Sequence, residues 1–499
     1  MKNKGLSNYI LVLVLILVSI GVYVNTLKGD FLIDDEQGIL NNERIHDIGT
    51  YFSNHFKIKP GALLEISRVF LWNISKNNPF CYHLFNVLVH TGCVILLFIL
   101  CGILFNNKTL SFLSSFIFAV HPIHTEAVSW ISGGHYAFSG LFYIAAFIFY
   151  VKSFNSIRNL CLCVLFFVLC LFSGNACATL PFMFILYDLF FRGEGKERVA
   201  CRRIRIAFLS SIFILAIIFL AAFFISKNDF MHKIFYFRGF NYLIVAAKAF
   251  VYYLKILYLP VQRGLYHPFA FNTTHIQDVS PALFYSLVIL LIAGWSFFKF
   301  RRSFKPLSFG VMWFFLTYAP YSNIVPMCNI ISERYLYLPS LGFCVIMAAL
   351  FLKAWEIINR SVNYRKALRL LAVAALTLFL GSYMLLTIAH NYEYDNIITY
   401  WETNIRNFPD GYTVYNNLAA TYYRMGNINN AIAYCLINLM VDSGQPHVWC
   451  NLGKIYREIG DFDQARYCYQ EVLKIDEDYF PAVKALQELN IKEKDENEQ

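Results

Sequence analysis

The sequence predicts an all-α protein with about eleven membrane-spanning helices, followed by a C-terminal solenoid of short helical repeats. Of its 499 residues, 58% are hydrophobic and 15% are charged, whereas soluble proteins carry about 25% charged residues. Several runs reach the roughly 20 apolar residues that a bilayer crossing requires. After residue 390 the composition becomes that of a soluble protein, and two segments repeat there with a period of about 34 residues.

The positive charge is distributed as in a membrane protein. The net charge is +10, and lysine and arginine gather in short loops between apolar runs, at 192–205, 299–305 and 360–369. This distribution follows the positive-inside bias, so it favours membrane lipid as the surroundings and argues against a nucleic-acid partner. Most of the 13 cysteines lie singly in apolar runs, which favours packing over disulfides or metal ligands.

Eleven apolar runs are predicted to cross the membrane, and the first is a retained N-terminal helix. That run has the basic flank and apolar core of a signal peptide, but it is long and no small-x-small cleavage site follows it. We therefore place the N-terminus in the cytoplasm. The predicted crossings are 9–27, 83–105, 111–131, 136–151, 159–173, 176–191, 206–226, 282–299, 307–321, 336–355 and 367–389.

The apolar segment 241–260 is excluded from the crossings by charge parity. If it crossed, the basic loop 299–305 and the basic run after Asn359 would face outward, against the positive-inside bias. Lys248 and Lys255 are seven residues apart on one helical face, which suits a helix lying in the interface. A tilted spanning helix with snorkelling lysines is the alternative.

This topology divides the chain into two domains. Residues 1–390 form the membrane domain, with outer loops at 28–82 and 227–281, and residues 391–499 form the repeat domain. The predicted count of crossings places the C-terminal repeats on the outer side, in the periplasm or the lumen of the endoplasmic reticulum. Any chemistry is then expected on the outer face, because the inward loops are short and basic.

The C-terminal segment has the tetratricopeptide pattern. NNLAATYYRMGNINNAIAYC aligns with CNLGKIYREIGDFDQARYCY, and the matched pairs are Leu418 with Leu452, Tyr422 with Tyr456, Gly426 with Gly460, and Ala431 with Ala465. Small residues where two helices touch and aromatic residues between them are typical of this repeat. TYWETNIRNFPD is predicted to be the second helix of an incomplete leading repeat, and 480–490 a capping helix. Such arrays bind a peptide or a partner protein; a packing or dimerisation appendage is the alternative.

Four polar stretches fall on the outer side and supply the candidate site residues. These are Asp34, Asp35, His83, Asn86, His121, His124, Glu126, Glu333, Arg334 and Tyr337. Taken singly, the acids suit a solvated loop, and the histidines and asparagine suit contacts between membrane helices. Two histidines without a third ligand are a weak metal signal, so the metal stays open. Ionisable groups near bilayer depth are costly, so their convergence on one side predicts a shared site.

Carboxylates and an arginine at a membrane surface suit the transfer of a sugar from a lipid phosphate to an acceptor hydroxyl. A carboxylate would remove the acceptor proton as general base. The arginine, or a divalent metal ion, would take up the charge that develops on the departing lipid phosphate. The membrane would present the donor at the right depth, which is a proximity effect.

The same residues carry a family resemblance. FLIDDEQGILNN, YHLFNVLVH, FAVHPIHTEAVSWI and NIVPMCNIISERYLYLPSLGF, followed by the repeats, resemble the transmembrane and tetratricopeptide-repeat O-mannosyltransferases of the C-type glycosyltransferase superfamily. The resemblance implies the C-type fold and an inverting transfer of a hexose, mannose, from a polyprenyl-phosphate sugar to a protein hydroxyl. It also implies Asp34 or Asp35 as the base, Glu126 as its acidic companion and Arg334 as the contact to the donor phosphate. The repeats would present the protein or peptide acceptor.

Three departures from the family pattern favour a second hypothesis. The chain has Gly61-Ala62 where relatives commonly have Arg-Pro, Gly133-Gly134 where they have Gly-Arg, and Gly174-Asn175 where many have Lys-Glu. Small or neutral residues at these positions are compatible with a different sugar or a different metal dependence. They are also compatible with a catalytically inactive membrane scaffold whose repeats bind protein partners.

Overall fold

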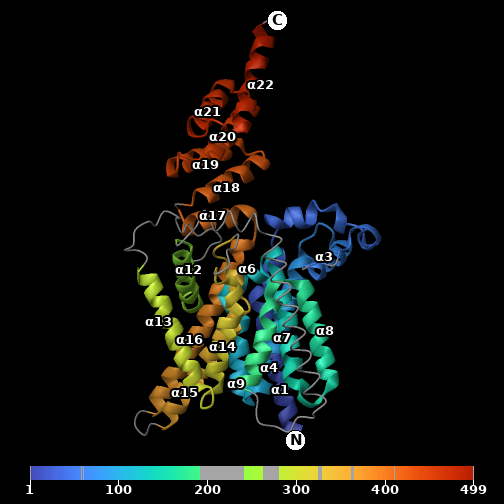
Figure 1. Cartoon of the computed structure of the whole chain (residues 1–499), viewed down its shortest axis with the longest axis vertical. Helices are drawn as coiled ribbons and strands as arrows, with labels where there is room; N and C mark the ends of the chain where they lie inside the picture. The colour runs from blue at the N-terminus through green and yellow to red at the C-terminus, as the bar shows by residue number, and fades with distance from the viewer. Residues whose placement is uncertain are drawn as a thin grey trace. The chain divides into compact units, whose positions relative to one another are not determined.

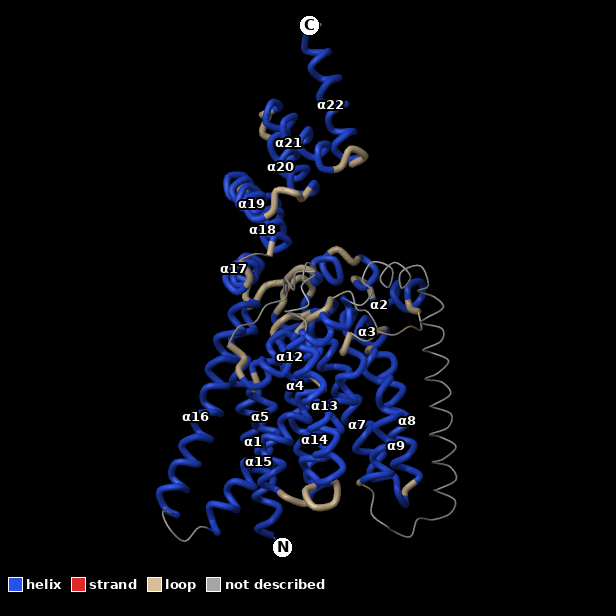
Figure 2. Tube along the Cα trace, turned by 60° about the vertical axis from the view of Figure 1, so that its left-hand side comes forward, coloured by secondary structure: helices blue, strands red, loops and turns tan. Residues whose placement is uncertain are grey.

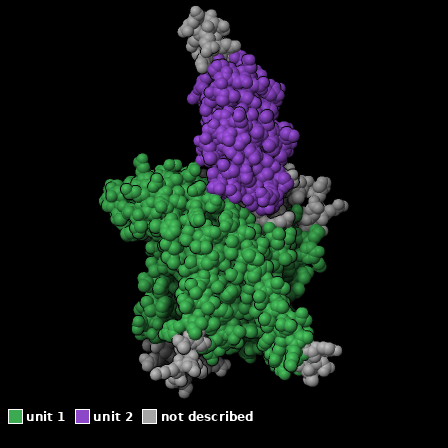
Figure 3. Space-filling view, turned by 180° about the vertical axis from the view of Figure 1, so that it is seen from behind, with its two compact units in different colours: residues 1–262, 270–395 green, residues 263–269, 396–499 purple. Residues whose placement is uncertain are grey.

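The structure is a computed structural model that describes residues 2–57, 59, 61–191, 241–261, 280–323, 329–360, 365–409 and 411–497. These residues are helical or in loops, and none of them forms a β-strand. The chain divides into two compact units, coloured separately in Figure 3: residues 1–262 with 270–395, and residues 263–269 with 396–499. The predicted crossing 206–226, the basic loop 192–205 and most of the predicted outer connection 227–281 lie outside the described residues.

The described residues of the first unit include six helices that are long and apolar enough to cross a membrane. They are α1 (Lys2–Tyr23), α4 (Phe80–Phe105), α7 (His135–Lys152), α13 (Ser280–Phe300), α15 (Pro339–Arg360) and α16 (Arg365–Asn391). The shorter helices α5 (Lys108–Val120), α8 (Ile157–Ser173), α9 (Leu180–Phe190) and α14 (Lys305–Tyr318) accompany them. The predicted class of helical membrane protein is confirmed. The number of eleven crossings stays a prediction.

The long helices of the first unit run side by side from the end that holds the N-terminus to an end that carries α3 and α6 (Figure 1 and Figure 2). Helix α4 packs against α1, α5 and α7, and α14 packs against α15. A Cβ atom on Gly310 of α14 would lie 2.7 Å from the carbonyl oxygen of Gly342 on α15. Small residues at such a crossing allow the close backbone approach that replaces the hydrophobic effect between membrane helices.

The predicted crossing 111–131 is interrupted in the structure. Helix α5 ends at Val120, and a short turn η5 (Pro122–His124) and helix α6 (Thr125–Val128) follow. The break begins at His121, which is extended with ψ 123°, as expected for the residue before a proline. The polar stretch 121–135 is therefore folded at the end of the bundle, where it contacts the following turns.

Helix α12 (Asn241–Tyr258) covers the apolar segment for which the sequence left two orientations open, in the membrane interface or across the membrane. It is not one of the six candidate spanning helices. Most of its described side chains are buried, and Tyr253 donates a hydrogen bond to the carbonyl of Ser332 at 3.3 Å. Its orientation relative to a membrane stays a prediction, and its structural role is to support the 329–338 stretch.

The outer loop 28–82 is a packed cap with little irregular chain. It contains η2 (Glu36–Leu40), η3 (Glu43–Ile45), α2 (Ile48–Thr50), η4 (Tyr51–His55) and α3 (Ala62–Ser75). Ile39, Tyr51 and Val69 form part of a buried core within it. Packed apolar side chains give this cap a defined conformation, so its polar residues are held in fixed positions.

The second unit is the predicted helical repeat array. Its helices are α17 (Ile397–Asn407), α18 (Tyr412–Arg424), α19 (Ile428–Val441), α20 (Pro446–Glu458), α21 (Phe462–Ile475) and α22 (Phe480–Asn497). Ala431 and Ala465 are fully buried where paired helices touch. Gly426 and Gly460 have φ of +76° and +85° between the helices of each pair, a conformation that favours glycine. The repeat pattern, the leading helix and the capping helix are confirmed.

Candidate active site

Asp34 and Asp35 lie at the start of the outer cap and have opposite environments. Asp34 is exposed, whereas Asp35 is fully buried. The residue before them, Ile33, has φ +34°, which is rare for a β-branched side chain. Strained backbone of this kind clusters at functional sites, and here it belongs to the turn that places two neighbouring carboxylates in different surroundings.

Asp35 joins the outer cap to the 121–135 stretch. Its Oδ1 accepts hydrogen bonds from the backbone N–H of Ser132, at 2.8 Å, and from the Ser132 hydroxyl, while Oδ2 accepts from the N–H of Leu32 at 2.9 Å. Burial raises the pKa of Asp35 to about 6, although the hydrogen bonds from Ser132 and Leu32 and the charge of Arg68 act in the opposite direction. Both oxygens accept hydrogen bonds, so this carboxylate holds the outer cap against Ser132.

Arg68 is a site residue that the sequence analysis missed. It extends from α3, donates from Nη2 to the Ser132 hydroxyl at 3.2 Å, and interacts electrostatically with Asp35 and Asp34. Burial lowers the pKa of Arg68 and the neighbouring carboxylates oppose this change, so the side chain stays cationic. A lone arginine in the mainly apolar helix 62–75 was the signal available in the sequence; Ser132 offered none.

Glu126 and Arg334 form a buried ion pair between two of the predicted stretches. The guanidinium Nη1 lies 3.0 Å from Glu126 Oε1, and the exposed fractions of the two residues are 8% and 1%. Glu126 also accepts from the Ser332 hydroxyl at 2.7 Å and from the N–H of Arg334 at 2.8 Å. These contacts fix the arginine, and neighbouring Glu333 is buried in the same turn, η11 (Glu333–Leu336).

Aromatic rings surround the Arg334 guanidinium. Its central carbon lies 4.8 Å from the ring centre of Trp130, 5.7 Å from that of Tyr136 and 6.0 Å from that of Tyr335. Cation–π attraction of this kind strengthens when water is excluded. The Nε atom of Arg334 is buried and has no hydrogen-bond partner among the described residues.

His135 lies between the two arginines. Its Nδ1 contacts the carbonyl of Ser132 at 2.8 Å, and it is within electrostatic range of both Arg68 and Arg334. The residues Asp35, Arg68 and Ser132 are therefore connected through His135 to the Glu126–Arg334 pair. The structure brings the first outer loop, the 121–135 stretch and the 332–337 stretch into one polar cluster.

The glycines at 133 and 134 are explained by close packing. A Cβ on Gly134 would collide with the Asn86 side chain, and a Cβ on Gly133 would collide with the backbone of Glu126. Asn86 donates to the carbonyls of Trp130 and Ile131, both at 3.2 Å. A larger residue at 134 would displace this asparagine, so the small residues follow from the close approach of α4 at Gly134 and of α6 at Gly133.

The remaining predicted residues make internal contacts next to the cluster. His83 Nε2 contacts the Gly29 carbonyl at 3.2 Å, and His121 Nε2 contacts the Leu257 carbonyl at 3.1 Å. The Tyr337 hydroxyl lies 2.8 Å from His90 Nδ1, and His124 Nε2 lies 2.8 Å from the Ser340 hydroxyl. These contacts hold the neighbouring loops and helices in place around the site.

The described side chains of the site do not form a cluster of ligands for a divalent metal. No group of three or more His, Cys, Asp or Glu side chains that could hold a metal ion occurs in the described part of the chain. Asp35 has both oxygens engaged by hydrogen-bond donors, and Glu126 is paired with Arg334. No step is therefore derived through a metal.

The fold and the cluster define a polytopic helical membrane protein with tetratricopeptide repeats and a buried carboxylate–arginine site. Tetratricopeptide-repeat family descriptions match residues 446–479 and 413–436. The chain is 26% identical over 454 residues to a protein O-mannosyl-transferase of Caenorhabditis elegans, covering 86% of this chain and 60% of that protein. It is 23% identical over 499 residues to protein O-mannosyl-transferase TMTC3 of Homo sapiens, covering 90% and 53%. The resemblance predicted from the motifs is confirmed.

A shorter match has higher identity. The chain is 32% identical over 174 residues to protein O-mannosyl-transferase tmtc2 of Xenopus laevis, covering 32% of this chain and 20% of that protein. The chain thus spans between half and two thirds of the length of the relatives it matches along most of its sequence.

Proposed function

We propose that the chain is a membrane glycosyltransferase that transfers a hexose, mannose, from a polyprenyl-phosphate sugar to a protein hydroxyl on the outer face, with inversion. The observation that carries this proposal is the exposed Asp34 carboxylate beside a buried cluster that contains Arg68 and Arg334. The names of the relatives, protein O-mannosyl-transferases, support the reaction class.

Asp34 is the candidate general base. A base must reach the hydroxyl whose proton it removes, and Asp34 is exposed whereas Asp35 is buried with both oxygens accepting hydrogen bonds. Asp35 is then a positioning residue that holds the loop against Ser132. Arg68 acts electrostatically on both carboxylates, so a positive charge lies beside the candidate base.

Arg334 is the candidate contact to the donor phosphate. Its guanidinium is fixed by Glu126 and by the surrounding aromatic rings. A preorganised donor aimed at developing charge lowers the barrier because it needs no reorganisation during the reaction. The lipid phosphate gains charge as the glycosidic bond breaks, so the arginine would stabilise the transition state.

The repeats are the candidate acceptor site. Between α18 and α20 there is a hollow of about 170 Å³ whose lining includes Asn416, Tyr423, Asn451 and Lys454. Asn451 donates to the side chain of Asn416 at 3.0 Å, so two amide groups lie side by side there. Amide side chains can pair with the backbone groups of an extended peptide, which supports presentation of a protein acceptor by this unit.

The test is transfer in reconstituted vesicles that contain polyprenyl-phosphate mannose and a serine- or threonine-containing peptide. Asp34→Asn is expected to lower turnover by roughly 10²- to 10⁴-fold, the usual contribution of a general base. Asp35→Asn is expected to lower it as well, by misplacing the loop. Glu43→Gln, which changes an exposed acid of the same cap, is the matched control and should keep the wild-type rate.

The scaffold hypothesis gives a different result in the same assay. A scaffold would bind the polyprenyl-phosphate sugar or a protein partner without forming product in the wild-type protein. The neutral residues at 61, 62, 133, 134, 174 and 175 favour it. Wild-type turnover in both aspartate variants would remove the catalytic assignment while leaving the reaction class intact.

A further inference from the structure

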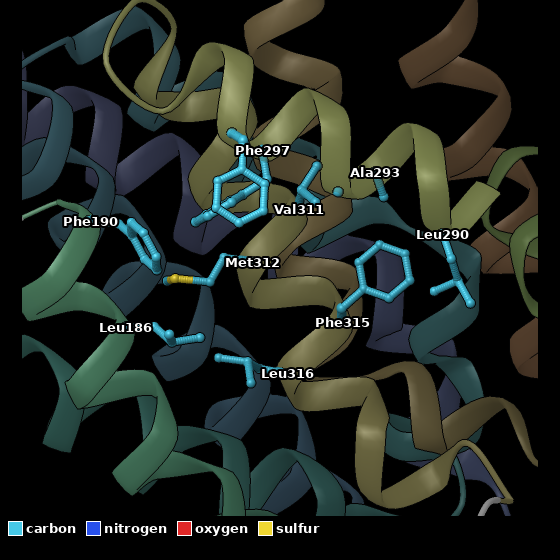
Figure 4. A pocket seen from close by; sticks show the side chains of 11 residues that line it. Leu186, Phe190, Leu290, Ala293, Phe297, Val311, Met312, Phe315 and Leu316 are labelled. Carbon is cyan, nitrogen blue, oxygen red and sulfur yellow. The ribbon is translucent and has the colours of Figure 1, made fainter. Parts of the chain in front are cut away.

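A groove whose described lining is apolar lies between α9, α13 and α14 (Figure 4). Its volume is about 530 Å³, within the range of sites that hold small molecules. The lining includes Leu186, Phe190, Leu290, Phe297, Met312 and Phe315. Gly294 contributes to one wall, and a Cβ placed on it would meet no atom within 4 Å, so the groove has free space along α13.

Cationic side chains gather at one end of this groove. The turn between α13 and α14 and the adjoining helix ends carry Lys299, Arg301, Arg302 and Lys305. The guanidinium carbon of Arg301 lies 5.5 Å from the ring centre of Phe190 and 5.9 Å from that of Phe298, two residues of the lining. Among residues 241–261, 280–323 and the other described ranges, no carboxylate forms an ion pair with these four cations.

The described groove helices α9, α13 and α14 carry one acidic residue. Asp188 on α9 accepts a hydrogen bond from the Tyr150 hydroxyl at 2.8 Å, so it is engaged with α7. The combination is an apolar surface that ends in positive charges without an ion-pair partner among the described residues.

This basic turn is remote from the candidate active site. Helix α14 begins at Lys305, and just beyond its other end Tyr321 stacks on Tyr335, with ring centres 5.0 Å apart. Fourteen helical residues span about 21 Å at 1.5 Å per residue. A phosphate bound at the basic turn could not also contact Arg334.

We propose that the groove binds an acyl chain of an anionic phospholipid, whose phosphate lies against Arg301 and the neighbouring cations. Each lysine or arginine near an anionic lipid surface favours binding, and the apolar lining suits a hydrocarbon chain. The predicted topology places this turn in the inner leaflet. The proposal does not depend on the transfer reaction, because it concerns the end of the bundle away from the polar cluster.

The test is native mass spectrometry of the full chain in detergent, titrated with phosphatidylglycerol, with phosphatidylcholine of the same acyl chains, and with polyprenyl phosphate. Wild-type protein should retain phosphatidylglycerol at the lowest concentration. Arg301→Gln/Arg302→Gln should weaken it about thirty-fold, from about tenfold per 1.4 kcal/mol and about 1 kcal/mol per cation. Arg365→Gln/Lys366→Gln, which removes two cations at the start of α16, is the matched control and should leave it unchanged.

A second variant tests the groove itself. Gly294→Phe fills the open wall and should reduce retention of phosphatidylglycerol while Arg301 and Arg302 stay in place. Equal retention of the two phospholipids, or equal weakening by the control variant, would overturn the proposal. Stronger retention of polyprenyl phosphate that displaces phosphatidylglycerol would also overturn it, since the groove would then belong to the sugar donor.

Discussion

Replacing Asp35 by asparagine should change how the stability of the protein depends on pH. Burial moves the pKa of Asp35 from its ordinary value of 3.8 to about 6 in the folded state. A raised folded-state pKa stabilises the protein fully below about pH 4, and that stability is lost as the pH rises through 6. The total is about 3 kcal/mol, of which about 2 kcal/mol falls between pH 4.5 and 7.5. Asparagine resembles the protonated carboxyl and cannot ionise.

The assay is unfolding of purified protein in detergent, by denaturant titration at pH 4.5 and 7.5. Wild type should lose about 2 kcal/mol of stability between pH 4.5 and pH 7.5 that Asp35→Asn keeps. The stability of the variant relative to wild type should therefore be about 2 kcal/mol higher at pH 7.5 than at pH 4.5. Asp34→Asn makes the same chemical change at the exposed neighbour and is the comparison for the amide substitution itself. Identical pH dependence in wild type and Asp35→Asn would refute the reasoning, because the carboxyl would then not carry the burial penalty.

Two other substitutions test one buried contact in each unit, an ion pair in the first and a helix contact in the second. Glu126→Gln removes the carboxylate that pairs with Arg334 at 3.0 Å and should destabilise the protein by about 3 kcal/mol in the same titration, because a buried cation loses its partner; an unchanged midpoint would contradict this. Gly453→Ala places a Cβ 2.9 Å from the ring of Tyr469 and should cost about 1–3 kcal/mol. It should be visible as faster proteolysis within 396–497 of the full chain, and wild-type resistance would show that the ring moves aside.

The helical architecture was predictable from the sequence because its signals are local. Apolar runs mark the bundle helices, and the recurrence of Gly426 and Gly460 marks the repeat turns, where φ is positive. The prediction of one crossing over 111–131 was wrong, because helix α5 ends at Val120. The proline at 122 was visible in the sequence, but the mean hydropathy of the window concealed its effect on the helix.

The candidate site was only partly predictable, since its contacts are between distant residues. The motifs identified Glu126 and Arg334 but did not show that they pair, because 208 residues separate the Glu126 carboxylate from the N–H of Arg334 that it accepts. Asp34 and Asp35 were indistinguishable in sequence, and only the turn at Ile33 and the partner Ser132 separate their environments. Arg68 was not predicted, because no local pattern in the sequence indicates that α3 places it near Asp35.

The three departures from the family pattern carry different weight once their surroundings are known. Gly134 is crowded by Asn86, and a Cβ on Gly174 would lie 2.6 Å from the Ser139 hydroxyl, so at both positions the small residue fits a close approach. The pair at 61–62 lacks a cation, but α3, which begins there, brings Arg68 to the Asp35 carboxylate. Positive charge is therefore present beside the acidic loop despite the neutral motif positions. For that reason the choice between a transferase and a scaffold depends on the behaviour of the exposed Asp34 carboxylate more than on the residues that the chain lacks.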